Sequence, residues 1–129
     1  MNLVRQPKGS NLCGQACVAT LCEITLDEAI MLTRKRGKTR TCDLKQALRA
    51  MGMSTAERRK VGMPDRHETA LLFFKSKDGK WCHWVLWHKG KYYDPQAGVF
   101  RKLPRYLEDA DMASHLRVYF CGEKVRTGD

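Results

Sequence analysis

Apolar residues in the first 52 positions recur at helical spacing, in three short groups. The first group covers about residues 14–22 and follows a polar loop. The other two groups have apolar positions at i, i+3, i+4 and i+7, which is the period of one helix face. These positions are Leu26, Ala29, Ile30 and Thr33 in the second group, and Leu44, Ala47, Leu48 and Met51 in the third. The pattern therefore predicts three short helices.

Residues that favour helix ends bound the second and third groups. Thr25 and Glu28 have the spacing of a capping box, so the second helix is predicted to begin after Thr25. Gly37 is predicted to end this helix, because it follows basic residues that favour a helix C-terminus. Thr41 is predicted to cap the third helix and Gly52 to stop it.

From residue 53 onward the pattern changes to alternating positions and short apolar runs between turn residues, which is typical of strands. Hairpin turns are expected at Asp78-Gly79 and Lys89-Gly90. The predicted strands cover about residues 54–60, 69–74, 80–88, 91–93 and 116–121, with a short helix within residues 104–114 and a frayed tail from Gly122. Helices followed by antiparallel strands predict an α+β fold with the helices on one face of the sheet.

The size and composition fit one globular domain over residues 1–129. A chain of 129 residues can build one core and is too short for two. The sequence contains no apolar run of membrane-spanning length and no secretory signal, so we expect a cytoplasmic protein. Its six cysteines are scattered among apolar neighbours, and we expect reduced thiols.

The chain is strongly basic, with 24 Lys and Arg against 14 Asp and Glu and a formal net charge of +10. Such a surface attracts nucleic acid, acidic membranes or an acidic protein or peptide. The densest basic clusters lie at residues 34–40, 58–60 and 75–80. The first two contain no aromatic residues on which bases could stack, so nucleic acid is a possible partner but not the favoured one.

Cys13 is the candidate nucleophile, because it lies where a polar loop enters the first predicted helix. Residues 6–21 read QPKGSNLCGQACVATL, which puts this thiol in the first helical turn. Unpaired backbone N–H groups and the positive end of the helix dipole favour a thiolate there. Gly14 is expected to leave room for a substrate backbone beside the sulfur. Cys17, one turn further on, is expected to lie in the core.

The register of the second hairpin brings a histidine and a carboxylate together. If Lys89-Gly90 is a two-residue turn, Val85 pairs with Asp94. Asp94 is then a diagonal neighbour of His83 on the same sheet face, within side-chain reach. A carboxylate beside an imidazole fixes its tautomer and stabilises its charged form. His83 is therefore the candidate base and Asp94 the candidate orienting residue. The other histidines are expected at the surface: His67, His88 and His115.

Nucleophilic catalysis by a thiol also needs donors that stabilise the oxyanion. The Cys13 backbone N–H and the Gln6 side-chain amide are the candidates for this role. A zinc site is not favoured, because the sequence lacks a C-x-x-C pair and an H-x-x-x-H helix. We therefore expect no metal and no other cofactor.

Three ordered motifs carry a resemblance to a known family: Gln6 with Asn11-Leu12-Cys13-Gly14-Gln15-Ala16-Cys17, then His83-Trp84-Val85, then Tyr93-Asp94-Pro95-Gln96-Ala97-Gly98. The sequence resembles the papain-like cysteine peptidases, specifically the peptidase C39-like group. That group has a Gln ahead of Cys-Gly-x-Ala-Cys on a helix, a His opening a strand, and an Asp-Pro-x-x-Gly turn after the next strand. Here Gln6 precedes Cys13 by seven residues, where six is usual.

The resemblance implies a minimal papain-like fold, and a cysteine peptidase or isopeptidase that forms a thioester acyl-enzyme on a peptide or protein substrate. It implies that Cys13 is the nucleophile, His83 the base, Asp94 the orienting residue and Gln6 an oxyanion donor. Compact, basic versions of this kind suggest a bacterial or phage source. Two alternatives stay open: an acyltransferase that uses the same residues, and a basic binding or inhibitor module on an idle scaffold.

Overall fold

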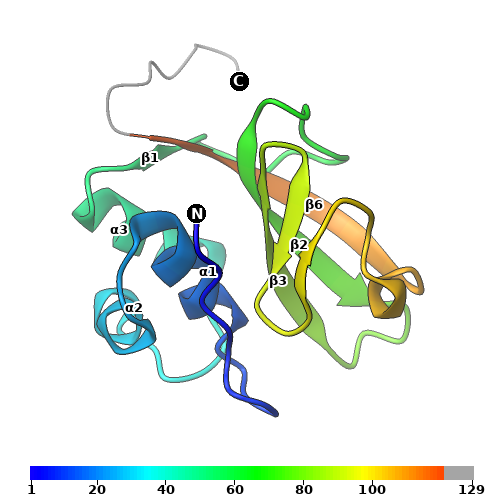
Figure 1. The fold of residues 1–129 in the computed structure, drawn as a ribbon, viewed down its shortest axis with the longest axis horizontal. Coiled ribbons are helices and arrows are strands. Elements are labelled where there is room, and N and C mark those ends of the chain that lie inside the picture. The colour runs from blue at the N-terminus through cyan, green and yellow to red at the C-terminus, as the bar shows by residue number, and fades with distance from the viewer. Residues whose placement is uncertain (121–129) are drawn as a thin grey trace.

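The computed structural model describes residues 1–120, in which three helices pack on one face of a six-stranded antiparallel sheet (Figure 1). The helices are α1 (Cys13–Cys22), α2 (Leu26–Thr33) and α3 (Thr41–Ala50). The strands are β1 (Ser54–Thr55), β2 (Thr69–Ser76), β3 (Cys82–His88), β4 (Lys91–Asp94), β5 (Gly98–Phe100) and β6 (Ala110–Tyr119), and the short 3-10 helix η1 (Arg105–Leu107) precedes β6. The strand order is β1-β6-β2-β3-β4-β5. The predicted α+β class is confirmed.

Helix α2 begins where the sequence predicts and ends earlier. In its capping box, the Glu28 N–H donates to Thr25 Oγ1 at 3.1 Å and the Thr25 N–H donates to the Glu28 carboxylate at 3.1 Å. The predicted stop at Gly37 is wrong, because Arg34 already takes a left-handed conformation at φ 58° and ends the helix. A non-glycine residue in this conformation gives no signal in the sequence pattern.

Helix α3 has the predicted stop and a different start. Thr41 is its first helical residue and not its cap; instead, the Arg40 N–H donates to the Asp43 carboxylate at 2.8 Å. At the other end Gly52 has φ 81°, and its N–H donates to the Arg49 carbonyl at 3.0 Å. Such a left-handed glycine satisfies the last carbonyl groups of a helix.

The observed strands differ from the predicted ones mainly in length. The strand predicted over residues 54–60 is reduced to β1 and one isolated bridge between Lys60 and His115. The short helix predicted within residues 104–114 is present as η1, and β6 begins at Ala110, earlier than predicted. The register between β2 and β6 shifts between Phe73 and Phe74, so a bulge interrupts the alternation and hides this part of β6 in the sequence.

Two further differences concern the ends of the sheet. Strand β5 was not predicted; it pairs with β4 and forms one edge of the sheet. The predicted end of the last strand at residue 121 and the tail from Gly122 lie outside the described residues. No helix within residues 1–120 is long and apolar enough to cross a bilayer.

Apolar clusters cover both faces of the sheet. The larger cluster lies between the helices and the sheet and includes Val18, Leu44, Leu71, Trp84, Leu86 and Leu116. The smaller lies on the other face and includes Leu72, Phe74, Val85, Trp87 and, from η1, Leu107. Successive residues of β3 therefore point to opposite faces and are buried on both, which explains the continuous apolar run in this strand.

The β3–β4 hairpin has the predicted register. Its pairs are Leu86 with Tyr93, Trp87 with Tyr92 and His88 with Lys91. Lys89 and Gly90 have φ 49° and 74°, so both central residues have the positive φ of a type I′ turn. This register brings Asp94, the last residue of β4, beside the start of β3.

Candidate active site

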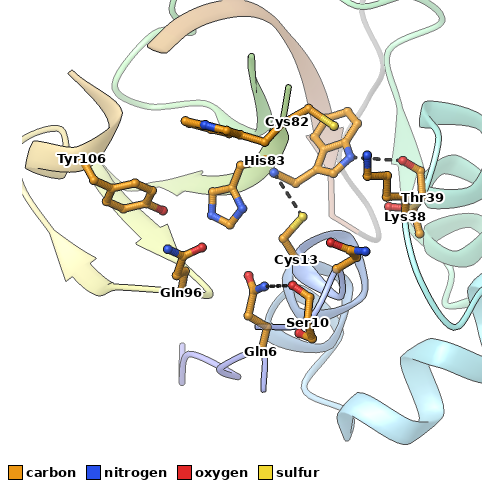
Figure 2. A pocket seen from close by; sticks show the side chains of 12 residues that line it. Gln6, Ser10, Cys13, Lys38, Thr39, Cys82, His83, Gln96 and Tyr106 are labelled. Atoms are coloured by element: carbon orange, nitrogen blue, oxygen red, sulfur yellow. Dashed lines mark hydrogen bonds between the residues drawn. The ribbon is translucent and has the colours of Figure 1, made fainter. Parts of the chain in front are cut away.

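A cleft of about 450 Å³ lies where the N-terminus of α1 meets the start of β3 (Figure 2). Cys13, His83 and Gln6 line this cleft, and Asp94 contacts His83. The four candidate residues from the sequence are thus brought together, although about 70 residues separate Cys13 from His83 along the chain. The other lining residues are Ser10, Asn11, Lys38, Thr39, Trp81, Cys82, Trp84, Gln96 and Tyr106.

Cys13 is the first residue of α1 and is half-buried. The first backbone hydrogen bond of the helix runs from the Ala16 N–H to the Leu12 carbonyl at 2.9 Å. The N–H groups of the three residues before Ala16 therefore have no helical acceptor. The Cys13 sulfur also accepts a hydrogen bond from the Trp84 backbone N–H at 3.4 Å. These donors and the helix dipole favour negative charge on the sulfur.

Asp94 is fully buried behind His83 and accepts three hydrogen bonds. Its Oδ1 lies 2.8 Å from His83 Nε2 and accepts from the Gln96 N–H at 2.9 Å, while Oδ2 accepts from the Tyr106 hydroxyl. Burial by itself raises the pKa of Asp94, but the bonds from His83 and Tyr106, the charge of His83 and the Gln96 N–H lower it overall. Because Nε2 is bonded to Asp94, Nδ1 is the ring nitrogen left for Cys13.

His83 lies between the phenol of Tyr106 and the sulfur of Cys13 (Figure 2). The residue is only 5% exposed, and burial by itself would lower its pKa. The hydrogen bond with Asp94, the adjacent Cys13 sulfur and the negative charges of Asp94 and Cys13 outweigh burial and raise the pKa of His83 to about 9. The imidazolium is therefore favoured at neutral pH.

The raised pKa of His83 predicts that the free energy of unfolding falls as the pH rises. With an ordinary pKa of 6.5 in the unfolded chain and about 9 in the folded one, only the folded chain holds this proton between the two values. The stabilisation is full below about pH 6.5, is lost as the pH passes about 9, and amounts to at most about 3 kcal/mol. Urea unfolding at several pH values measures this loss. We expect His83→Gln to flatten the pH dependence, and an unchanged slope would contradict the assignment.

The N-terminal loop that carries Gln6 is fixed to the turn after β4. The Gln6 N–H donates to the Pro95 carbonyl at 3.0 Å. The Arg5 guanidinium donates to the carbonyls of Pro95 and Gln96 at 3.2 and 2.6 Å. The site therefore rests on a contact between the first residues of the chain and the residues that follow Asp94.

A turn between Gln6 and α1 aims the Gln6 side chain at the cleft. The Ser10 N–H donates to the Pro7 carbonyl at 3.0 Å, with Gly9 at φ 75°. Gln6 Nε2 donates to the Ser10 carbonyl at 2.9 Å, while Gln6 Oε1 is buried and has no hydrogen-bond partner among the described residues (Figure 2). An amide nitrogen carries two hydrogens, so one donor remains for a ligand in the cleft.

The space beside Gly14 is filled by the protein and is not open to a substrate. A Cβ on Gly14 would lie 2.0 Å from Thr39 Oγ1 and 3.1 Å from Leu44 Cδ2. The prediction that Gly14 leaves room for a substrate backbone is therefore wrong. The glycine instead lets the loop before α3, which forms one wall of the cleft, pack against α1. The Trp84 indole donates to the Thr39 carbonyl at 3.5 Å on the same wall.

We expect Gly14→Ala to displace Thr39 and to lower the free energy of unfolding by about 1–3 kcal/mol, the usual cost of overpacking. Chemical denaturation measures the change. Gly37→Ala is the matched control, because a Cβ at Gly37 meets nothing within 4 Å. Equal free energies of unfolding for the two variants would show that the loop before α3 moves aside without loss of stability.

Some residues were missed or misjudged from sequence. Tyr106 was missed, because its segment carries no motif. His115 was expected at the surface, yet it is 5% exposed and its Nδ1 lies 2.5 Å from the Gly62 carbonyl. His67 is exposed and His88 half-buried.

One thiol beside the site, that of Cys17, lies in the core as the sequence predicts. Cys17 is buried, and its sulfur donates to the Trp84 carbonyl at 3.7 Å. Burial, followed by the negative charges of Cys13 and Asp94, raises the pKa of Cys17, so this thiol stays protonated. Within residues 1–120 all five cysteines are free, and no group of His, Cys, Asp and Glu there could hold a metal ion.

No protein-family model matches the sequence, and no curated protein matches it. Among solved structures, the chain is similar to the crystal structure of a double glycine motif protease from an AMS/PCAT transporter in complex with the leader peptide. The TM-score is 0.62 over 90% of this chain and 89% of that chain, at 16% sequence identity. This likeness confirms the predicted papain-like, C39-like fold class.

Proposed function

We propose that the protein is a cysteine peptidase or isopeptidase whose nucleophile is Cys13. One observation carries the proposal: Cys13 and His83 line the same cleft, and His83 is hydrogen-bonded to the buried Asp94 behind it. A thiol, an imidazole and a carboxylate in series are what acyl transfer by a cysteine requires. The structural neighbour is a protease that binds a peptide, which supports this class of reaction.

In this proposal the Cys13 thiolate attacks the carbonyl carbon of the scissile bond. The Cys13 N–H and the Gln6 side-chain amide stabilise the oxyanion. His83 then gives its proton to the leaving amine as the C–N bond breaks, which leaves a thioester on Cys13. His83 next takes a proton from water, whose oxygen attacks the thioester, and the thiolate leaves as the acid product forms. Asp94 stabilises the imidazolium in both half-reactions.

The cleft favours an acidic peptide. A second hollow of about 480 Å³ adjoins it and shares three lining residues: Gln6, Ser10 and Gln96. Apart from His83, the charged lining residues of the two hollows are Lys38 on one side and Arg5 and Lys8 on the other. Among the described residues, no Asp or Glu lines either hollow. A peptide with carboxylates on both sides of the scissile bond would therefore meet positive charge at each end.

Selective alkylation tests the nucleophile. With limiting iodoacetamide at neutral pH, we expect mass spectrometry to find Cys13 modified before Cys42, which is exposed and lies outside the cleft. His83→Ala should remove this selectivity, because it removes the counter-ion of the thiolate. Equal modification of Cys13 and Cys42 in the wild-type protein would count against the proposal.

Peptide hydrolysis tests the substrate class. We expect kcat/KM to be higher for an acidic peptide than for a neutral one of equal length, and salt to reduce the difference. Lys38→Gln should reduce the preference by up to about fivefold, the size of an exposed ion pair. Lys102→Gln, an exposed change away from both hollows, should leave it unchanged.

The net charge of +10 also favours a second candidate, a basic binding module on an idle scaffold. Tight, steeply salt-dependent binding of nucleic acid that Cys13→Ser leaves unchanged, without any acyl-enzyme, would support that function. An acyltransferase with the same residues would be recognised by the product mass after a trial amine acceptor is added.

A further inference from the structure

Tyr106 contacts Asp94 and His83 on the side of the His83 ring opposite Cys13. The residue comes from η1, which is anchored by Leu107 in the smaller core cluster. Its hydroxyl donates to Asp94 Oδ2. Its ring lies beside that of His83 (Figure 2), edge-on, with the centroids 6.2 Å apart. Tyr106 is 37% exposed while Asp94 behind it is fully buried. The phenol is thus part of the outer cover of the carboxylate.

We propose that Tyr106 is a positioning residue, which fixes the Asp94 carboxylate and thereby the His83 ring for the reaction at Cys13. The inference rests on the proposed function and adds a residue to it. It depends on the different donors that the two Asp94 oxygens have: Oδ1 accepts from His83 and the Gln96 N–H, and Oδ2 accepts from Tyr106.

The Tyr106 hydroxyl has a role that other groups nearby do not supply. Within the described part of the chain, Asp94 Oδ2 has Tyr106 as its one hydrogen-bond donor. Without that donor, the carboxylate is free to turn about its last torsion angle, and water can reach Oδ2 where the phenol oxygen was. A hydrated and mobile carboxylate holds an imidazolium less strongly than a fixed and dry one.

The phenol remains a donor over the whole range in which the site can work. Burial raises the pKa of Tyr106, and so do the hydrogen bond to Asp94 and the negative charges of Asp94 and Cys13. The titratable groups that face the pair are His83 from β3, Asp94 from β4, and the thiols of Cys13 and Cys17 from α1. Tyr106 therefore keeps its proton while His83 and Cys13 exchange theirs.

Removal of the Tyr106 hydroxyl should weaken the stabilisation that Asp94 gives to the His83 imidazolium. The pKa of His83 should then fall below its value of about 9, because burial, which lowers it, is opposed less strongly. The thiolate–imidazolium pair should form at a higher pH and be lost at a lower pH. The pH range of rapid Cys13 alkylation should therefore narrow from both sides in Tyr106→Phe.

The test compares Tyr106→Phe with Tyr92→Phe, a matched control. Tyr92 lies on β4 two residues before Asp94, but its ring packs edge-on against Trp87 with the centroids 4.9 Å apart. In Tyr106→Phe we expect NMR titration of His83, identified by the resonance lost in His83→Ala, to show the lowered pKa. We also expect Cys13 alkylation at neutral pH to slow by about tenfold, the effect of one lost bond to a charged group. Tyr92→Phe should match the wild-type protein in both measurements.

The outcomes separate this inference from the proposed function. If Cys13 is selectively reactive and Tyr106→Phe has the wild-type His83 titration and alkylation profile, the inference is wrong and the proposed function stands. If wild-type Cys13 shows no selective reactivity, the proposed function fails, while the His83 titration still decides whether Tyr106 acts through Asp94. A fall in melting temperature with an unchanged His83 titration would overturn the positioning role, because it would mark Tyr106 as structural only.

Discussion

Replacement of Cys13 by alanine is expected to lower kcat/KM for peptide hydrolysis by a factor of roughly 10⁴ or more. Without the sulfur no thioester can form, and the remaining catalysis is limited to binding and oxyanion stabilisation. The fold should persist, because Cys13 is only half-buried in the first turn of α1 and the fully buried residues of this helix are unchanged. Steady-state hydrolysis and trapping of the acyl-enzyme by acid quench measure the two losses.

Cys42→Ala is the control for this prediction, since it removes an exposed thiol outside the cleft. It should retain the activity of the wild-type protein. Persistent hydrolysis in Cys13→Ala would point to another nucleophile. The next residue to replace would be Cys82, which has a free thiol and lines the same cleft.

Asp94→Asn is expected to lower kcat/KM by roughly 10² to 10⁴, close to the effect of the same change in other catalytic triads. The neutral amide keeps the size of the side chain and removes its charge. The pKa of His83 is held at about 9 against burial partly by the Asp94 carboxylate, so it should fall in the variant. The alkaline limb of the activity profile, where the imidazolium is lost, should therefore move to lower pH.

The profile should be measured beside that of Asp111→Asn, which removes an exposed carboxylate from β6. This control should keep the wild-type pH dependence. An Asp94→Asn variant with an unshifted alkaline limb would mean that another group holds the proton on His83.

The pairing of His83 with Asp94 could be predicted from sequence because it depends on local geometry. A two-residue turn at Lys89-Gly90 fixes which residues of the two strands face each other, and few residues separate the pair along the chain. The position of Cys13 at a helix N-terminus followed in the same way from a polar loop that enters an apolar run. Only the meeting of these two local elements required the resemblance to a known family.

The features that were missed depend on distant contacts. The space beside Gly14 is occupied by Thr39, and no local pattern says which segment will pack against a glycine. Tyr106 reaches Asp94 from a 3-10 turn whose position follows from the burial of Leu107 and from the bulge that extends β6. Arg34 ends α2 in a left-handed conformation that sequence propensity assigns to glycine.

Trp84 has a consequence for how this site can change over evolution. Its main-chain N–H and C=O contact two sulfur atoms one helical turn apart, on Cys13 and Cys17, and it directly follows His83 in the strand. The distance between the Cys13 sulfur and the His83 ring is thus set by backbone N–H and C=O groups, which every amino acid except proline supplies in full. Substitutions at position 84 can reshape the wall of the cleft and leave that spacing intact.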